Sequence, residues 1–144
     1  MNTRSYAWAL WFLTGLFAFR VAAQPAALAF DRLLPSFNSW DGGVLPYPVL
    51  LVTQLGILGW LTSTAWRFST GRVTARPSIG RAALAFGGVY FAAMFLRLLL
   101  GATLFGDVRW FASPLPAFFH LVLATYLLLD GYCHLHTVAG NASR

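Results

Sequence analysis

Residues 82–105 read AALAFGGVYFAAMFLRLLLGATLF, a run in which Arg97 is the single charged side chain. A segment of this length crosses the hydrocarbon core of a bilayer, which is about 30 Å thick. Because lipid offers the backbone no hydrogen-bond partners, a lone segment that crosses it must be helical. Three further runs have the same character, residues 6–24, 48–67 and 116–136. The sequence therefore predicts an all-α integral membrane protein whose four transmembrane helices form a single domain over residues 1–144.

The composition excludes several classes of protein. Of the 144 residues, 58% are hydrophobic and 10% are charged, against about 25% charged in ordinary soluble domains. The single cysteine, Cys133, rules out an intrachain disulfide. The motifs of phosphate-binding loops, zinc proteases and serine hydrolases are missing from the sequence. The net charge of +6 comes from ten arginines and four aspartates, and the positions of the arginines indicate membrane topology rather than a nucleic-acid partner.

The arginines predict the orientation of the bundle. The loop between the second and third runs is rich in arginine and contains no acidic residue, with Arg67, Arg72, Arg76 and Arg81. By the positive-inside rule this loop faces the cytoplasm, so we expect an inner-membrane protein with both termini cytoplasmic. A second interpretation stays open, because Arg4, an apolar stretch and residues 21–23, VAA, also resemble a cleaved signal peptide. In that case three spans would remain.

The two predicted outer loops resemble each other. Residues 40–48 read WDGGVLPYP and residues 110–116 read WFASPLP, so each runs from a tryptophan to Pro-x-Pro at the start of a helix. Each preceding helix also carries an arginine in its outer half, Arg20 or Arg97. This pattern favours two related helical hairpins. The alternative is that tryptophan and proline are common wherever chains enter membranes.

Four polar residues, one from each predicted helix, fall in the outer half of the membrane. At about 1.5 Å of rise per residue, Arg20 and His120 lie about 6 Å deep, Gln54 about 9 Å and Arg97 about 12 Å. Polar residues within spans usually face the interior of the bundle. We therefore expect a binding site for an anionic or amphipathic ligand such as a lipid headgroup. Arg97 would pair with the anion, and Gln54 and His120 would orient it.

Further residues extend this predicted site. Tyr90 lies on the same face as Arg97, below it, and Arg20 would contribute from the first helix. The long outer loop would cover the ligand with Trp40 and Asp41, and Trp110 would do so from the second outer loop. Residues 26–34 would form a short amphipathic helix on the membrane surface.

A second group of polar residues lies near the inner end of the fourth helix. Asp130 and His134 are four residues apart on one helical face, a spacing that suits a metal ion or a proton relay. His136 points elsewhere, and a structural zinc site needs four ligands. Asp130 could instead pair with Arg97, since their predicted depths differ by about 9 Å.

Other functions remain open from the sequence. No cofactor is predicted, because all three histidines lie on the fourth helix and a bis-histidine haem would need a dimer or a partner subunit. An intramembrane enzyme could use His120 as a base, but no serine or cysteine nucleophile lies at that depth, and Thr53, adjacent to Gln54, is the one hydroxyl to test. An accessory subunit of a larger, redox-type membrane complex is the remaining alternative. Its contacts with that complex, or with a second copy, would use small residues, namely Gly56, Gly59, Gly87 and Gly88.

Overall fold

The computed structural model describes residues 3–30, 32–40, 45–74 and 76–142, and within these ranges it contains no β-strand. The elements are α1 (Thr3–Ala26), the 3-10 helix η1 (Phe37–Trp40), α2 (Tyr47–Ser69), α3 (Pro77–Thr103), the short α4 (Arg109–Ala112) and α5 (Pro114–Ala142). Four helices are long and apolar enough to cross a membrane, over Tyr6–Ala26, Tyr47–Ser69, Pro77–Thr103 and Pro114–His136. The prediction of an all-α, multi-pass membrane bundle is confirmed.

Prolines mark the starts of three long helices. Pro77 and Pro114 are the first residues of α3 and α5, and Pro48 is the second residue of α2. The first turn of a helix tolerates proline because the missing N–H would lack an intrahelical partner there. At the other end of α2, Gly71 adopts a left-handed φ of 67°, and the Arg72 N–H donates to the Arg67 carbonyl. These contacts stop α2 and turn the chain towards α3.

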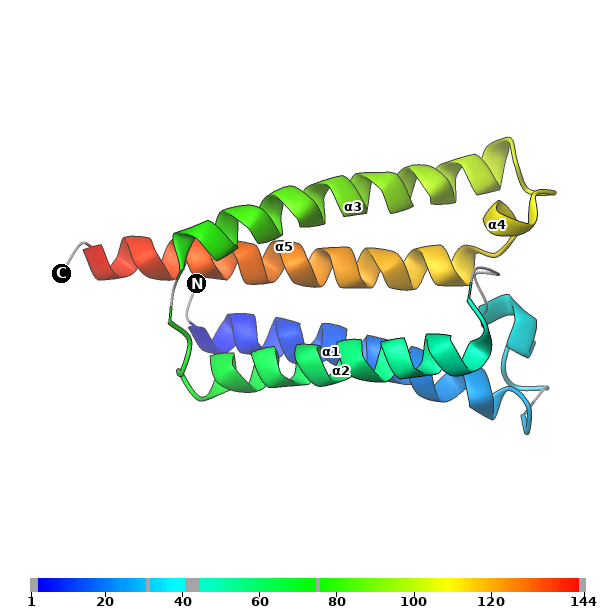
Figure 1. The fold of residues 1–144 in the computed structure, drawn as a ribbon, viewed down its shortest axis with the longest axis horizontal. Coiled ribbons are helices and arrows are strands. Elements are labelled where there is room, and N and C mark those ends of the chain that lie inside the picture. The colour runs from blue at the N-terminus through cyan, green and yellow to red at the C-terminus, as the bar shows by residue number, and fades with distance from the viewer. Residues whose placement is uncertain (1–2, 31, 41–44, 75, 143–144) are drawn as a thin grey trace.

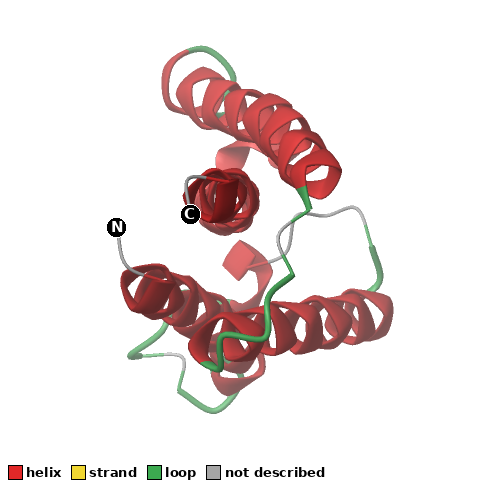
Figure 2. Cartoon of the chain, turned by 90° about the vertical axis from the view of Figure 1, so that its left-hand side faces the viewer, coloured by secondary structure: helices red, strands yellow, loops and turns green. Residues whose placement is uncertain are grey.

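The four long helices form two antiparallel hairpins. In Figure 1, α1 and α2 lie side by side, and α3 lies along α5. Viewed along the helices, α5 sits between α3 and the α1–α2 pair (Figure 2). The hairpins meet mainly where α1 packs on α5, whereas α2 and α3 make no extensive contact with each other. As a result, α1 and α5 carry most of the buried core.

Small residues allow α3 to lie close to α5. A Cβ atom added to Gly131 would lie 2.8 Å from the Gly80 carbonyl oxygen, and one added to Gly80 would lie 2.9 Å from the Gly131 oxygen. Gly87 meets Leu127 and Leu128 in the same interface. Gly87, predicted as a contact for a partner subunit, therefore packs against α5 of its own chain. In contrast, the other three predicted contact glycines, Gly56, Gly59 and Gly88, face open space.

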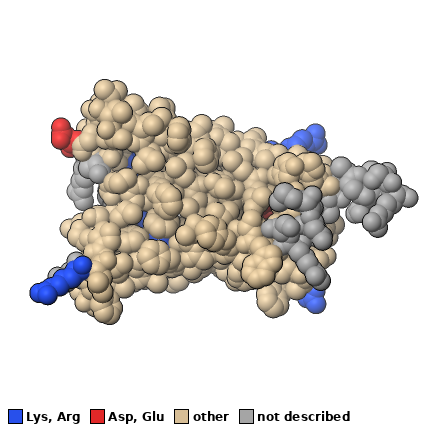
Figure 3. Space-filling model, turned by 180° about the vertical axis from the view of Figure 1, so that it is seen from behind, with Lys and Arg blue, Asp and Glu red and all other residues tan. Residues whose placement is uncertain are grey.

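The two ends of the bundle differ. Helix α1 begins and α5 ends at the same end as the connection between α2 and α3, which we call the basic end (Figure 1). The opposite end carries η1 and α4, and we call it the Trp-loop end. On the face shown in Figure 3, exposed charge gathers at these two ends, with a broad uncharged band between them.

The predicted amphipathic helix over residues 26–34 is wrong. Helix α1 ends at Ala26, and the chain continues in hydrogen-bonded turns, with Leu28 N–H donating to the Pro25 carbonyl and Leu33 N–H to the Phe30 carbonyl. Pro35 then disfavours a helical conformation at Leu34. The regular element of this loop is η1, which brings Trp40 into the bundle.

Candidate functional site

Each long helix carries one polar residue at a similar distance from the Trp-loop end. Arg20 and Arg97 lie six residues before the ends of α1 and α3, and His120 lies six residues after the start of α5. Gln54 lies seven residues after the start of α2. These spacings correspond to a depth of about 9 to 10 Å for all four residues. The deeper position predicted for Arg97 is corrected, because α3 ends at Thr103 rather than at Phe105.

Arg20 fastens the first loop to the bundle. Its side chain is 5% exposed, and its Nη2 donates to the Trp40 carbonyl oxygen at 3.0 Å. The guanidinium also lies 5.7 Å from the centre of the Phe119 ring. Trp40 is buried, stacks on Phe119 and donates its indole N–H to the Pro35 carbonyl. Instead of a removable lid, Trp40 forms a packed plug at this end, together with Ala23, Ala27 and Val122.

Arg97 makes the corresponding contact in the second hairpin. It is 6% exposed, and its Nε and Nη2 both donate to the Trp110 carbonyl oxygen, at 3.2 and 2.6 Å. The guanidinium lies 4.2 Å from the centre of the Trp110 ring, a distance typical of a cation–π contact. Within the described chain, Nη1 of Arg97 has no hydrogen bond, and the side chain has no carboxylate partner. The charge of Arg97 is therefore left without an anion.

His120 and Tyr90 link α5 to α3. The Tyr90 hydroxyl is hydrogen bonded to Nδ1 of His120, and the two rings meet edge to face with their centres 5.8 Å apart. Thr53, the candidate hydroxyl of the enzyme alternative, is exposed and donates to the Val49 carbonyl of its own helix.

Two glutamines have buried side-chain amides with polar atoms that lack hydrogen-bond partners in the described chain. Gln54 is 4% exposed, and its Oε1 has no partner in the described chain. Gln24 is 1% exposed, and neither its Oε1 nor its Nε2 has one. The buried hydroxyl of Tyr47 also has no hydrogen-bond partner in the described chain. Such groups cost free energy unless something satisfies them.

Gln24 and Tyr47 were not predicted as site residues. A signal existed, since Gln24 lies four residues after Arg20 and Tyr47 lies seven before Gln54, so each pair shares one helical face. Both residues sit at predicted span boundaries, where polar atoms normally reach water. Tyr47 instead packs its ring edge to face against Phe37 of η1, with the ring centres 4.9 Å apart.

The predicted lid residues differ from one another in the structure. Trp40 is packed into the bundle, and Trp110 is partly exposed on α4, where it covers Arg97. Asp41 lies outside the described residues. The hydroxyl of Ser113 donates to the Ser39 carbonyl at 2.5 Å. This contact joins the loop before α2, which carries Trp40, to the loop before α5, which carries Trp110, and we call these the two Trp loops.

Asp130 and His134 form a separate pair near the basic end. His134 Nε2 lies 3.8 Å from Asp130 Oδ1. Among the described residues no three His, Cys, Asp or Glu side chains are grouped as metal ligands. The predicted pairing of Asp130 with Arg97 is wrong, because Asp130 lies sixteen residues along α5 and so about 15 Å deeper than Arg97.

The chain shows no similarity that would assign this site. No known family model matches it, and neither do curated proteins or solved structures.

Proposed function

We propose that the protein is an inner-membrane protein that binds an anionic amphiphile, such as a lipid headgroup, among Arg97, His120, Gln54, Arg20 and Tyr90. In this proposal the Trp-loop end faces outwards and the basic end faces the cytoplasm, because the arginine-rich connection between α2 and α3 lies at the basic end. The ligand would come from the outer leaflet, with its acyl chains in the surrounding lipid.

The observation that carries the proposal is that the buried Arg97 guanidinium has a carbonyl partner but no counter-charge in the described chain. A guanidinium this deep in a membrane is costly, and such residues usually pair or line a wet cavity. The carbonyl of Trp110 satisfies one edge of the guanidinium but brings no negative charge. A phosphate or carboxylate oxygen at Nη1 would supply both the missing hydrogen bond and the counter-charge.

The other residues of the site suit an amphiphile with hydrogen-bonding groups beside its charge. Gln54 Oε1 is an open acceptor at nearly the same depth. His120 and Tyr90 present a polar pair on the neighbouring helices. Gln24, which is nearer the Trp-loop end, offers both a donor and an acceptor to a headgroup above the charge.

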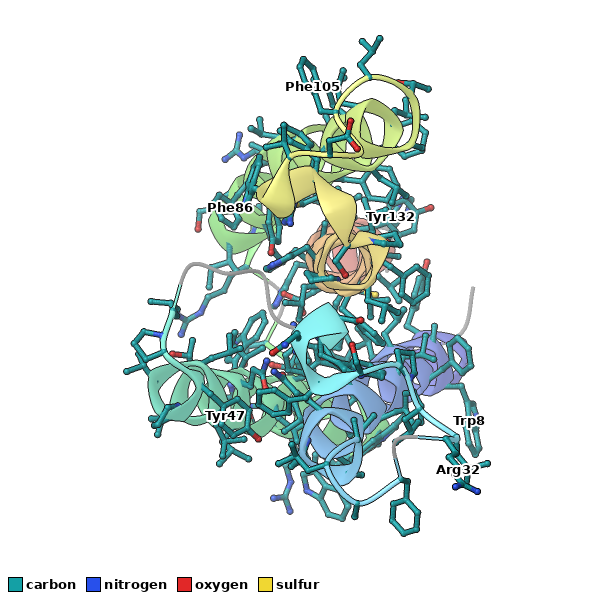
Figure 4. All side chains as sticks on the ribbon, turned by 90° about the vertical axis from the view of Figure 1, so that its right-hand side faces the viewer. Trp8, Arg32, Tyr47, Phe86, Phe105 and Tyr132 are labelled. Carbon is teal, nitrogen blue, oxygen red and sulfur yellow. The ribbon has the colours of Figure 1, made fainter. Side chains whose placement is uncertain are left out.

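Native mass spectrometry of protein released gently from its own membranes tests this proposal. The wild-type protein should retain a discrete anionic lipid. Arg97→Gln should retain at least about tenfold less of this lipid, because a charged hydrogen bond is lost. Arg32→Gln is the matched control, because Arg32 is exposed and points away from the bundle (Figure 4). Arg97→Lys, which keeps the charge, should recover part of the binding.

Two results would contradict the proposal. Equal lipid retention by Arg97→Gln and Arg32→Gln would remove Arg97 from the site. Wild-type protein found bare, or only with another protein, would favour the accessory-subunit alternative. In that case the open glycines on the outside of α2, Gly56 and Gly59, would be the first contacts to test.

A further inference from the structure

A cavity lies at the opposite end of the molecule from the proposed site. It has a volume of about 280 Å³ and opens between α2, the following connection, the start of α3, and α5. Three arginines line it, Arg67, Arg72 and Arg76, all of them exposed residues. Its size is at the lower end of ligand pockets in proteins, which suits a small molecule or a headgroup.

The wall formed by α5 carries the opposite charge. Asp130 lines the cavity and is 5% exposed, and its Oδ1 has no hydrogen-bond partner in the described chain. It is the single acidic residue within the four spans. A carboxylate that lines a cavity can accept hydrogen bonds from the N–H donors of a ligand.

His134 is held in place beside this carboxylate. Its Nδ1 accepts a hydrogen bond from the backbone N–H of Arg76 at 3.3 Å, at the start of α3. The proton of a neutral His134 ring must then reside on Nε2, on the side of Asp130. The connection between α2 and α3, which bridges the two hairpins at this end (Figure 2), is thereby fixed to α5.

The arginines on one wall of the cavity and the carboxylate on the other determine which kind of ligand fits it. A simple phosphate would suit the arginines but would place an anion near Asp130, and a simple amine would leave the arginines without a partner. A zwitterion in which a short chain joins a phosphate to a primary ammonium complements both walls. The ammonium has three N–H donors for the Asp130 carboxylate and for other oxygens that line the cavity, one of them on Thr64.

We infer that this cavity binds an amino-phosphate zwitterion, with its phosphate among Arg67, Arg72 and Arg76 and its ammonium at Asp130. The headgroup of phosphatidylethanolamine and free phosphoethanolamine share this chemistry. The site is separate from the one proposed above and does not depend on Arg97.

Full-length protein in phosphatidylcholine nanodiscs provides the test, with bound lipids counted by native mass spectrometry. Phosphatidylethanolamine, phosphatidylglycerol and soluble phosphoethanolamine are added in separate arms. Phosphatidylethanolamine should bind about tenfold more tightly than phosphatidylcholine, whose quaternary ammonium has no N–H to donate. Binding of phosphoethanolamine alone would support the site and identify a soluble ligand.

Variants connect the binding to this cavity. Asp130→Asn and Arg72→Gln should each weaken phosphatidylethanolamine binding about tenfold, whereas Asp107→Asn, at an exposed position outside both proposed sites, should leave it unchanged. Arg72 is exposed in the connection, so its variant tests the site even if Asp130→Asn fails to fold. The inference is overturned if neither amino-phosphate binds, if Arg72→Gln has no effect, or if phosphatidylglycerol competes equally for the same site.

Discussion

At the scale of single residues, two arginines perform the same structural task in the two hairpins. Arg20 donates to the carbonyl of Trp40, and Arg97 donates to the carbonyl of Trp110. Each contact fastens a Trp loop to the helix that precedes it. The difference is that Arg20 holds a buried plug, whereas Trp110 is partly exposed. In the proposed function, Arg20 therefore contributes mainly by holding this plug at the edge of the site, and Arg97 by pairing with the anion.

Removing Arg20 should destabilise the fold. Arg20→Met keeps the length of the side chain but leaves the Trp40 carbonyl without its donor, and such a loss costs about 1–3 kcal/mol of unfolding free energy. Denaturation by sodium dodecyl sulfate, followed by circular dichroism, measures this change. Arg32→Met, at an exposed position, should stay within about 0.5 kcal/mol of the wild type. Equal stability of the two variants would show that the Arg20 contact is not needed.

The burial of a charged side chain is easier to predict from the sequence than the groups that the side chain contacts. The cost of a buried guanidinium, together with small neighbours on its helical face, indicates from the sequence that Arg97 faces inward. For Arg20, which lies near the predicted interface beside bulky Leu16 and Phe17, the sequence favours snorkelling instead, and its burial is a finding of the structure. Their carbonyl partners depend on how the Trp loops fold back, which no residue spacing specifies. Gln24 was missed for a similar reason, since its burial depends on the loop above it.

At the scale of helices, the contact between α3 and α5 depends on Gly80 and Gly131. A methyl group on Gly131 would lie 2.8 Å from the Gly80 oxygen and 2.9 Å from the Leu84 nitrogen. Both are backbone atoms, so the helices would have to move apart. Gly131→Ala should therefore reduce the unfolding free energy by about 1–3 kcal/mol.

Gly59→Ala is the matched control for this prediction, because nothing lies within 4 Å of the added methyl group. Alanine also has the higher helix propensity, so this variant should be neutral or slightly more stable. The same denaturation assay compares the two variants. If Gly131→Ala were as stable as Gly59→Ala, the close approach of α3 and α5 would be wrong.

The extents of the helices could largely be predicted from hydropathy. The first two spans were placed within two residues of those in the structure, whereas α3 begins at Pro77 rather than at Ala82. Arg81 suggested a loop, but an exposed arginine in the first turns of a helix can reach the interface. Helix α4 has four residues, too few for a hydrophobic period to reveal it.

At the scale of the whole molecule, the repeat between the hairpins is incomplete. Both hairpins share the contact between arginine and a tryptophan carbonyl, which follows the sequence similarity of the two Trp loops. However, α1 packs on α5 while its counterpart contact, between α3 and α2, is not extensive. Packing order of this kind depends on the whole set of helix faces and could not be predicted from two short motifs.

The proposed orientation predicts which end is accessible from outside the cell. In a Cys133→Ala background, Val108→Cys at the Trp-loop end should react with a membrane-impermeant maleimide added from the outer side. Arg72→Cys at the basic end should react after the membrane is permeabilised. Both positions are exposed, so labelling reports their side of the membrane. The reverse pattern would invert the topology and place the Arg97 site in the cytoplasmic half.

The central claim is that Arg97 holds an anion, and arginine side-chain NMR tests it most directly. Protein labelled with ¹⁵N-arginine in a neutral detergent is titrated with lysophosphatidylglycerol, and the Arg97 Nε–H signal is assigned by its absence from Arg97→Gln. We predict that this signal shifts saturably while that of Arg32 stays in place. An unmoved Arg97 signal, with shifts confined to Arg67, Arg72 and Arg76, would contradict the claim.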